Sequence, residues 1–121
     1  QLTAVAGSPF TAGTQAYSLA LANSGANVYA ANRGDSTISG YSISSAFALT
    51  PLAGSPYSSG AQVTALGVDS TGKYLLAAAN GGTPDLTMYS FDATTPGALD
   101  NVTSAATDTD PANPVAIALT H

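Results

Sequence analysis

The five residues at 6–10, Ala-Gly-Ser-Pro-Phe, return almost unchanged at 53–57 as Ala-Gly-Ser-Pro-Tyr. The glycines of the two copies, Gly7 and Gly54, are 47 residues apart, and the segments that follow return at nearly the same spacing. An internal repeat of this length requires a fold made of similar units, each of which packs against the next. The repeat therefore constrains this chain more than any single residue does.

Each repeat contains short apolar runs separated by turn residues. Polar and apolar residues alternate within the runs, which is typical of strands with one buried face. The strands expected first lie at 2–6, 17–21, 27–32, 37–43 and 48–53. They return at 63–68, 74–80 and 86–91 and in a fourth strand that includes Asn101, and a last run lies at 115–119. Tyr89 follows Tyr41 by 48 residues, and we place the extra residue within 77–79.

Short strands at this spacing predict an all-β fold, and the repeat selects one kind. An immunoglobulin-like sandwich also has many short strands, but it predicts no internal sequence repeat. A repeat near fifty residues with four strands is typical of a propeller blade. We therefore predict a partial β-propeller of four-stranded antiparallel blades. Its parts are an outer strand at 1–8, a first blade at 17–56, a second blade at 63–107 and an inner strand at 114–121.

The charge of the chain argues against two classes of partner. Arg33 and Lys73 are its only Lys or Arg residues, against seven Asp and no Glu, and the net charge is −5. Binding to nucleic acid or to anionic lipid requires clustered cations, and no run approaches the roughly 20 apolar residues of a membrane-spanning helix. We expect neither a nucleic-acid partner nor membrane insertion. The first residue is Gln1 rather than Met, as in a processed mature protein or in a piece of a longer one, and the Lys-poor composition favours a secreted protein that is extracellular or on the cell surface.

Four motifs in the first repeat carry a resemblance to a known family. They read Ala-Gly-Ser-Pro-Phe, Ser-Gly-x-x-x-Tyr-x-Ala-Asn, x-Ile-Ser-x-Tyr-Ser-Ile and Ala-Leu-Thr-Pro. Together they resemble the lactonase-like (YVTN-type) β-propeller repeat over 2–51, again over 49–99, and in a fragment at 114–119. The resemblance implies four-stranded blades, which family members typically close seven to a ring. It also implies a family that contains sugar-lactone hydrolases beside secreted propellers with no known activity.

The chain is poor in the residue types that the resemblance implies for a hydrolase. Enzymatic members gather His, Arg and Glu at a channel mouth, whereas this chain has no Glu, a single Arg33 and a single His121. General acid–base catalysis depends on such groups. We therefore predict that the protein is not an enzyme and that it has no catalytic residues, no cofactor and no metal site.

Arg33, Gly34 and Asp35 spell the tripeptide that integrins read, and they are the weak binding candidate of this chain. A structural interpretation competes with adhesion. The tripeptide fills the expected turn between the second and third strands, where Gly allows a positive φ and Asp caps backbone amides. The second repeat has Gly-Gly-Thr-Pro-Asp at 81–85 instead, so the tripeptide is not repeated. We favour the turn.

Two further short motifs have a chemical interpretation. Asn101-Val102-Thr103 is an N-glycosylation sequon, which has meaning in a glycosylating host. Asp108-Thr109-Asp110 provides alternating carboxylates, as half of a calcium loop would, but it lacks the Gly and the distant acidic ligand of a strong motif. We interpret it as a solvated turn.

Tyrosines recur in the second and third expected strands, at Tyr29, Tyr41, Tyr74 and Tyr89. Exposed tyrosines could stack on sugars. Tyrosines in such positions more often pack between sheets, with the hydroxyl bonded at the rim. We predict packing.

Two blades alone leave apolar faces and strand edges without a partner, because a closed propeller needs at least four blades. We therefore expect copies of the chain to pack together, either closing a ring or extending a filament. The first hypothesis is a non-enzymatic extracellular structural or interaction protein that self-assembles through open blades. The alternatives are a fragment or subunit of a lactonase-type hydrolase and a cell-surface ligand-binding or adhesion module.

Overall fold

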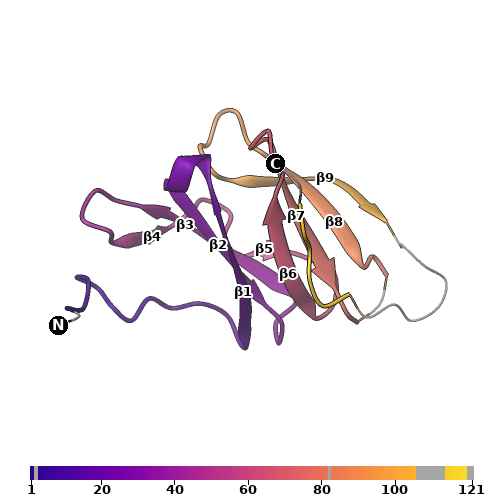
Figure 1. Ribbon diagram of the computed structural model, residues 1–121, viewed down its shortest axis with the longest axis horizontal. Helices are drawn as coiled ribbons and strands as arrows, with labels where there is room; N and C mark the ends of the chain where they lie inside the picture. Colours follow the sequence, from indigo (N-terminus) through magenta and orange to yellow (C-terminus); the bar gives the residue numbers. More distant parts are fainter. Residues whose placement is uncertain (2, 82, 106–113, 120–121) are drawn as a thin grey trace.

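The computed structural model describes residues 1, 3–81, 83–105 and 114–119, and the side chains of Asn101, Val102 and Ala105 are not described. The strands form two antiparallel sheets that pack side by side (Figure 1). This arrangement confirms the predicted all-β fold of propeller-like units. Within the described residues, no helix has the length and apolar character needed to cross a membrane.

The first sheet has the strand order β1-β2-β3-β4, and a short fifth strand also pairs with β3. Its elements are β1 (Ala16–Ala22), β2 (Asn27–Asn32), β3 (Thr37–Ile43), β4 (Leu49–Pro51) and β5 (Tyr57–Ser58). A three-residue turn, η1 (Asn23–Gly25), joins the first two strands. These bounds agree with the expected alternating runs, except at the outer edge of the sheet.

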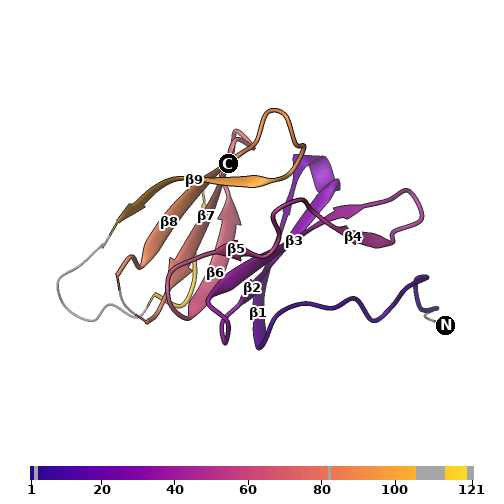
Figure 2. The same cartoon turned by 180° about the vertical axis from the view of Figure 1, so that it is seen from behind.

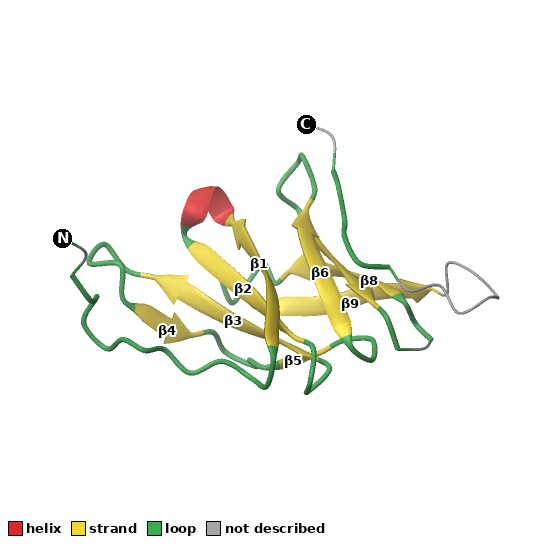
Figure 3. Ribbon diagram, turned by 60° about the horizontal axis from the view of Figure 1, so that its bottom comes forward, coloured by secondary structure: helices red, strands yellow, loops and turns green. Residues whose placement is uncertain are grey.

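The second sheet repeats the same order as β6-β7-β8-β9. Its elements are β6 (Val63–Val68), β7 (Tyr74–Ala79), β8 (Leu86–Phe91) and β9 (Leu99–Ala105). β6 lies against β1 and β2, so the inner strands of the two sheets are neighbours (Figure 3). The two sheets are thus consecutive blades.

The strand registers locate the extra residue of the second repeat. Ala31 pairs with Ile38 in the first sheet, and Ala78 pairs with Leu86 in the second. The offset is therefore 47 on the second strand (31 to 78) and 48 on the third (38 to 86). Our placement of the extra residue within 77–79 is wrong, because the turn after β7 contains it. A one-residue insertion inside a strand would have turned every following side chain to the other face.

The outer strands of the two blades differ. A strand was expected at 48–53, but β4 ends at Pro51, a loop follows, and β5 resumes the pairing with β3. The first blade therefore extends past its expected end at 56, to Ser58. In the second blade β9 is one continuous strand of seven residues. The Gly-Ser-Pro segment at 54–56 explains the interruption, since proline has no amide hydrogen for the ladder.

Neither terminal segment forms the strand that was expected of it. Within the described residues, 3–8 and 114–119 have no strand pairing. The missing feature in both cases is a ladder partner, which an adjoining blade would supply. The N-terminal segment runs along the side of the first sheet that faces away from the second sheet (Figures 1 and 2).

The apolar core lies between the two sheets. Tyr29, Ile38, Val63 and Leu75 are fully buried there, and Tyr89 is 2% exposed. The Tyr29 ring packs on Phe91 with 5.9 Å between ring centroids, and its hydroxyl donates to the carbonyl of Gly97 at 2.6 Å. The predicted packing of tyrosines between sheets is confirmed for this residue.

Candidate functional site

The first sheet has one face that no other sheet covers, and we call it the open face. Its side chains follow from the ladder, in which Leu21, Val28 and Tyr41 lie in one cross-strand row and Leu19 and Ala30 lie in the next. Leu19 is 69% exposed and Leu21 is 61% exposed. Two large apolar side chains at the inner edge of this face thus lack cover.

The N-terminal segment covers the outer part of the open face. The Tyr41 hydroxyl donates to the carbonyl of Thr11, and Tyr41 is 6% exposed. The same bond recurs in the second blade, where the Tyr89 hydroxyl donates to the carbonyl of Ser58 at 2.5 Å. Thr11 and Ser58 are 47 residues apart, so equivalent residues of the two repeats meet the following blade in the same way.

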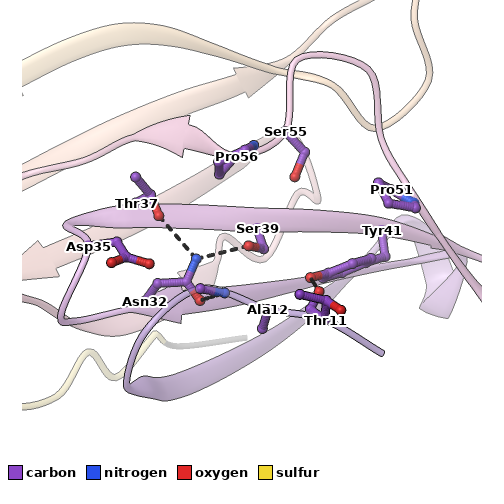
Figure 4. A pocket seen from close by; sticks show the side chains of 11 residues that line it. Thr11, Ala12, Asn32, Asp35, Thr37, Ser39, Tyr41, Pro51, Ser55 and Pro56 are labelled. Carbon is purple, nitrogen blue, oxygen red and sulfur yellow. Dashed lines mark hydrogen bonds between the residues drawn. The ribbon is translucent and has the colours of Figure 1, made fainter. Parts of the chain in front are cut away.

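A cavity of about 480 Å³ lies on the open face, between the N-terminal segment and the outer strand (Figure 4). Its lining is Thr11, Ala12, Gly13, Asn32, Asp35, Thr37, Ser39, Tyr41, Pro51, Ser55 and Pro56. The cavity is therefore lined by hydroxyl, amide and carboxylate groups as well as by two prolines.

Asn32 organises the inner end of the cavity. It is fully buried, and its side-chain NH₂ donates to the hydroxyls of Thr37 at 3.1 Å and Ser39 at 2.9 Å (Figure 4). Its side-chain oxygen accepts from the amide of Gly13 at 3.1 Å. A buried amide with these partners is satisfied. Asn32 therefore fixes the linker to the blade and leaves no free donor for a ligand.

Arg33, Gly34 and Asp35 lie in the turn between β2 and β3, as the structural interpretation predicted. The positive φ expected at Gly34 is wrong, because the residue of this turn with a positive φ is Ser36, at 56°. The Asp35 carboxylate accepts from the amide of Thr14 at 2.5 Å. This backbone hydrogen bond lowers the pKa of Asp35 below 3.8, so the carboxylate is ionised at neutral pH. Asp35 therefore anchors the linker before β1 rather than its own turn.

The Arg33 side chain spans the two blades. Its Nη2 donates to the Gln62 side-chain oxygen at 2.8 Å, and its guanidinium lies 5.8 Å from the centroid of the Tyr17 ring. Both charged side chains of the tripeptide thus have partners within the chain. The tripeptide motif that identifies Arg33 in the sequence does not predict its contact with Gln62, because that contact depends on how the blades pack.

The lining of the cavity lacks the groups that acid–base chemistry needs. Asp35 is the only carboxylate that lines the cavity, and neither His nor Lys lines it. A nucleophile activated by a neighbouring base is therefore missing from this lining. Among the residues that the structure describes, no three His, Cys, Asp or Glu side chains group as metal ligands would.

The remaining predicted residues lie elsewhere. Asn101 lies in β9, where its backbone pairs with Tyr89, but its side chain is not described. Asp108-Thr109-Asp110 and His121 lie outside the described residues. Tyr74 is half-buried in β7.

Two aspartates that sequence reasoning missed organise turns of the second blade. The Asp69 carboxylate accepts from the amides of Thr71 at 3.0 Å, Lys73 at 2.8 Å and Tyr74 at 2.7 Å. Asp92 accepts from the amides of Thr94 at 2.6 Å and Thr95 at 2.7 Å. Hydrogen bonding, first of all from the threonine hydroxyl, lowers both pKa values below 3.8. The available signal is an Asp two residues before a Thr at the end of a strand.

The comparison with protein families decides the relationship. The sequence model of the family described as "Lactonase, 7-bladed beta-propeller" matches residues 1–117. The chain belongs to this family. Membership in the lactonase propeller family confirms the resemblance that the repeat motifs carry, and no curated protein matches the chain.

Three solved structures show how the lactonase propeller fold of this chain relates to longer proteins. A functionally unknown protein from Desulfotomaculum acetoxidans has a TM-score of 0.64 at 16% identity, over 76% of this chain and 27% of that one. A putative 6-phosphogluconolactonase from Bacteroides fragilis has a TM-score of 0.62 at 20% identity, over 84% and 27%. A protein from Lactobacillus plantarum has a TM-score of 0.61 at 20% identity, over 84% and 29%. The chain thus spans little more than a quarter of the proteins that it resembles.

Proposed function

We propose that this chain is a structural or interaction protein that assembles with further propeller blades through its open face. The exposure of Leu19 and Leu21, at 69% and 61%, carries the proposal. Fully burying an exposed leucine side chain contributes about 1.5–3 kcal/mol. The equivalent leucine of the second blade, Leu66, is 8% exposed because the first blade covers it. Packing of another blade against the open face of the first blade is therefore favourable.

We also propose that the assembled role is non-enzymatic. The carboxylate in the described cavity is ionised at neutral pH, so Asp35 is not held in the protonated form that a general acid needs. The chain contains no Glu, and its one His is His121. The proposed extracellular location rests on composition alone, and detection of the protein in the culture medium of its source would test it.

Sedimentation velocity over a range of concentrations tests the assembly. We expect the parent chain to associate and the double variant Leu19→Asp with Leu21→Asp to be monomeric. The matched control, Ser45→Asp with Ala46→Asp, adds the same charge in an exposed turn and should associate like the parent. A parent chain that stays at 11.9 kDa at every concentration would overturn the proposal.

A second candidate function is a part of a lactone-hydrolysing propeller. It is favoured by the family match and by the likeness to a putative 6-phosphogluconolactonase. The test is hydrolysis of 6-phosphogluconolactone, followed by acid release. This candidate predicts no turnover by residues 1–121 alone and turnover by a seven-bladed protein that contains them. Absence of turnover by such a protein would refute this candidate.

A further inference from the structure

Three equivalent pairs of apolar residues occur at the inner strands of the repeats. They are Leu19 with Leu21 in β1, Leu66 with Val68 in β6, and Ile117 with Leu119 in the segment 114–119. We call 114–119 the C-terminal cap. The first two pairs are 47 residues apart (19 to 66), and the third pair follows after 51 (66 to 117). Each pair lies on the face of its unit that points toward the preceding unit.

Within the described residues, these pairs pack against two surfaces. The first is the side of β1 that faces the second sheet, where Ala20 packs in the same apolar cluster as Leu66 and Val68. There the amide of Leu66 also donates to the Ser18 hydroxyl at 3.3 Å. The second position is Gly67, which is the residue equivalent to Ala20, 47 residues later.

The C-terminal cap occupies the position at Gly67. A Cβ on Gly67 would lie 2.9 Å from Leu119 Cδ1 and 3.0 Å from Ile117 Cγ2, so both side chains touch this glycine. The cap lies beside β6, on the side away from β1 (Figure 3). The Thr64 hydroxyl donates to the carbonyl of Pro114 at 2.6 Å. Of the three pairs, Leu19 with Leu21 is therefore the one left exposed.

We propose that the outer face of β6, at Gly67, binds the first blade of a second copy of this chain, and that the C-terminal cap competes with it. In this head-to-tail contact Leu19 and Leu21 of one copy replace Ile117 and Leu119 of the other. The inference rests on the proposed function, because it uses the same open face and adds the identity of the partner and of the surface that receives it.

We expect the cap to bind the outer face of β6 more weakly than the first blade of a second copy does. The cap has no strand pairing, whereas β1 is a seven-residue strand that pairs with β2 through six residues. A whole blade also presents more apolar surface than a six-residue segment, and buried apolar area sets the driving force for association. The cap has the advantage of being tethered, so it prevails at low concentration and yields to a second copy at high concentration.

Removing the side chains of the cap should strengthen assembly. We expect Ile117→Asp with Leu119→Asp to lower the apparent dissociation constant in sedimentation velocity by about tenfold, the factor for a cap that leaves about a tenth of the molecules open. Val115→Asp is the matched control, because Val115 belongs to the same segment but is 69% exposed. It should leave association unchanged. Ile117→Ala with Leu119→Ala removes the same contacts without charge and should act in the same direction.

A peptide with the sequence Pro-Val-Ala-Ile-Ala-Leu, residues 114–119, provides a measurement in trans. Added in excess, it should dissociate the assemblies of the Asp variant, and a peptide with Asp at the Ile and Leu positions should not. Association of both cap variants that is equal to or weaker than that of the parent would overturn the inference. If Leu19→Asp with Leu21→Asp also left association unchanged, the proposed function would fail with it; if that variant were monomeric, only the role of the cap would fail.

Discussion

The two blades share a strand order and differ in what surrounds them. Leu19 in the first blade is 69% exposed, whereas its equivalent Leu66 in the second blade is 8% exposed. The sequence pattern around the two residues is the same, but only Leu66 has a preceding blade against it. In this fold the neighbouring unit determines whether a side chain is buried. An alternating strand pattern identifies a face that can be buried and does not identify its partner.

The outer edges of the blades extend the comparison. β9 is one seven-residue strand that pairs with β8 through six residues, whereas the outer strand of the first blade is divided into β4 and β5. The intervening loop returns a side chain to the ladder, because the Ser55 hydroxyl accepts from the amide of Gly40 at 2.9 Å. A side chain thus replaces a backbone partner where the strand is broken.

Truncation of a core side chain should give the largest difference in stability between equivalent positions of the two blades. Leu75 is fully buried and Val28, its equivalent, is half-buried on the open face. We expect Leu75→Ala to lower the free energy of unfolding by about 2–5 kcal/mol and Val28→Ala by about 1 kcal/mol. Urea unfolding followed by circular dichroism at low protein concentration measures both. Equal losses would show that the open face is covered in solution.

Alkaline pH should destabilise the contact between the blades. Burial raises the pKa of Tyr89 from 10.0 to about 12 and also raises the pKa of Tyr29 and Tyr57. Between pH 10 and about 12 the unfolded chain loses the Tyr89 proton more readily than the folded chain does, so stability falls as pH rises. Urea unfolding from pH 8 to 12 should show a flat region and then a decline, with a shallower decline for Tyr89→Phe. Constant stability up to pH 12 would contradict the burial of these phenols.

Loss of the hydroxyl at the broken outer strand should have an intermediate effect. Ser55→Ala leaves the Gly40 amide without its partner and should cost about 1 kcal/mol. Ser8 occupies the equivalent position in the first copy of the repeat motif but is exposed, so Ser8→Ala should leave the free energy of unfolding unchanged. Thermal melts of the two variants provide the measurement. A comparable loss in Ser8→Ala would indicate that the N-terminal segment is paired in solution.

The turn after β6 should show the smallest effect. The Asp69 carboxylate accepts a hydrogen bond from the backbone amide of Lys73 in this turn. The residue equivalent to Asp69 in the first blade, 47 residues earlier, is Ala22. The pKa of Asp69 lies below 3.8 in the folded chain, so its contribution is present above that pH and is lost as pH falls through the folded-state value. We expect Asp69→Ala to lower the melting temperature slightly at pH 7 and by progressively less as the pH is lowered into the acid range. Ser70→Ala, in the same turn, serves as the control, and a difference that persists in acid would refute the assignment to the carboxylate.

The inner three strands of each blade could be predicted from sequence, whereas the edges could not. The alternating runs at 27–32 and 63–68 match β2 and β6, because each carries its own face pattern. The runs at 2–6 and 115–119 have similar patterns but no ladder partner, and the described parts of both are not strands. Propensity alone does not form a strand without a partner.

The candidate site was predictable only in part. The position of Arg33 and Asp35 in a turn follows from local sequence. Their partners, Gln62 and Thr14, come from other segments and depend on the path of the linkers and on how the blades pack. No local pattern contains that information.

The Gly-Ser-Pro corner has the same shape in both copies, although only the second belongs to a blade with a paired outer strand. Gly7 and Gly54 have φ values of 89° and 79°, and the amides of Ser8 and Ser55 donate three residues back at 3.0 Å and 3.1 Å. The corner therefore needs no adjoining ladder to take its form. Since it is self-contained, gene duplication can add or remove whole repeats at this point without altering the joints between them, and the number of blades can change while the blade itself stays constant.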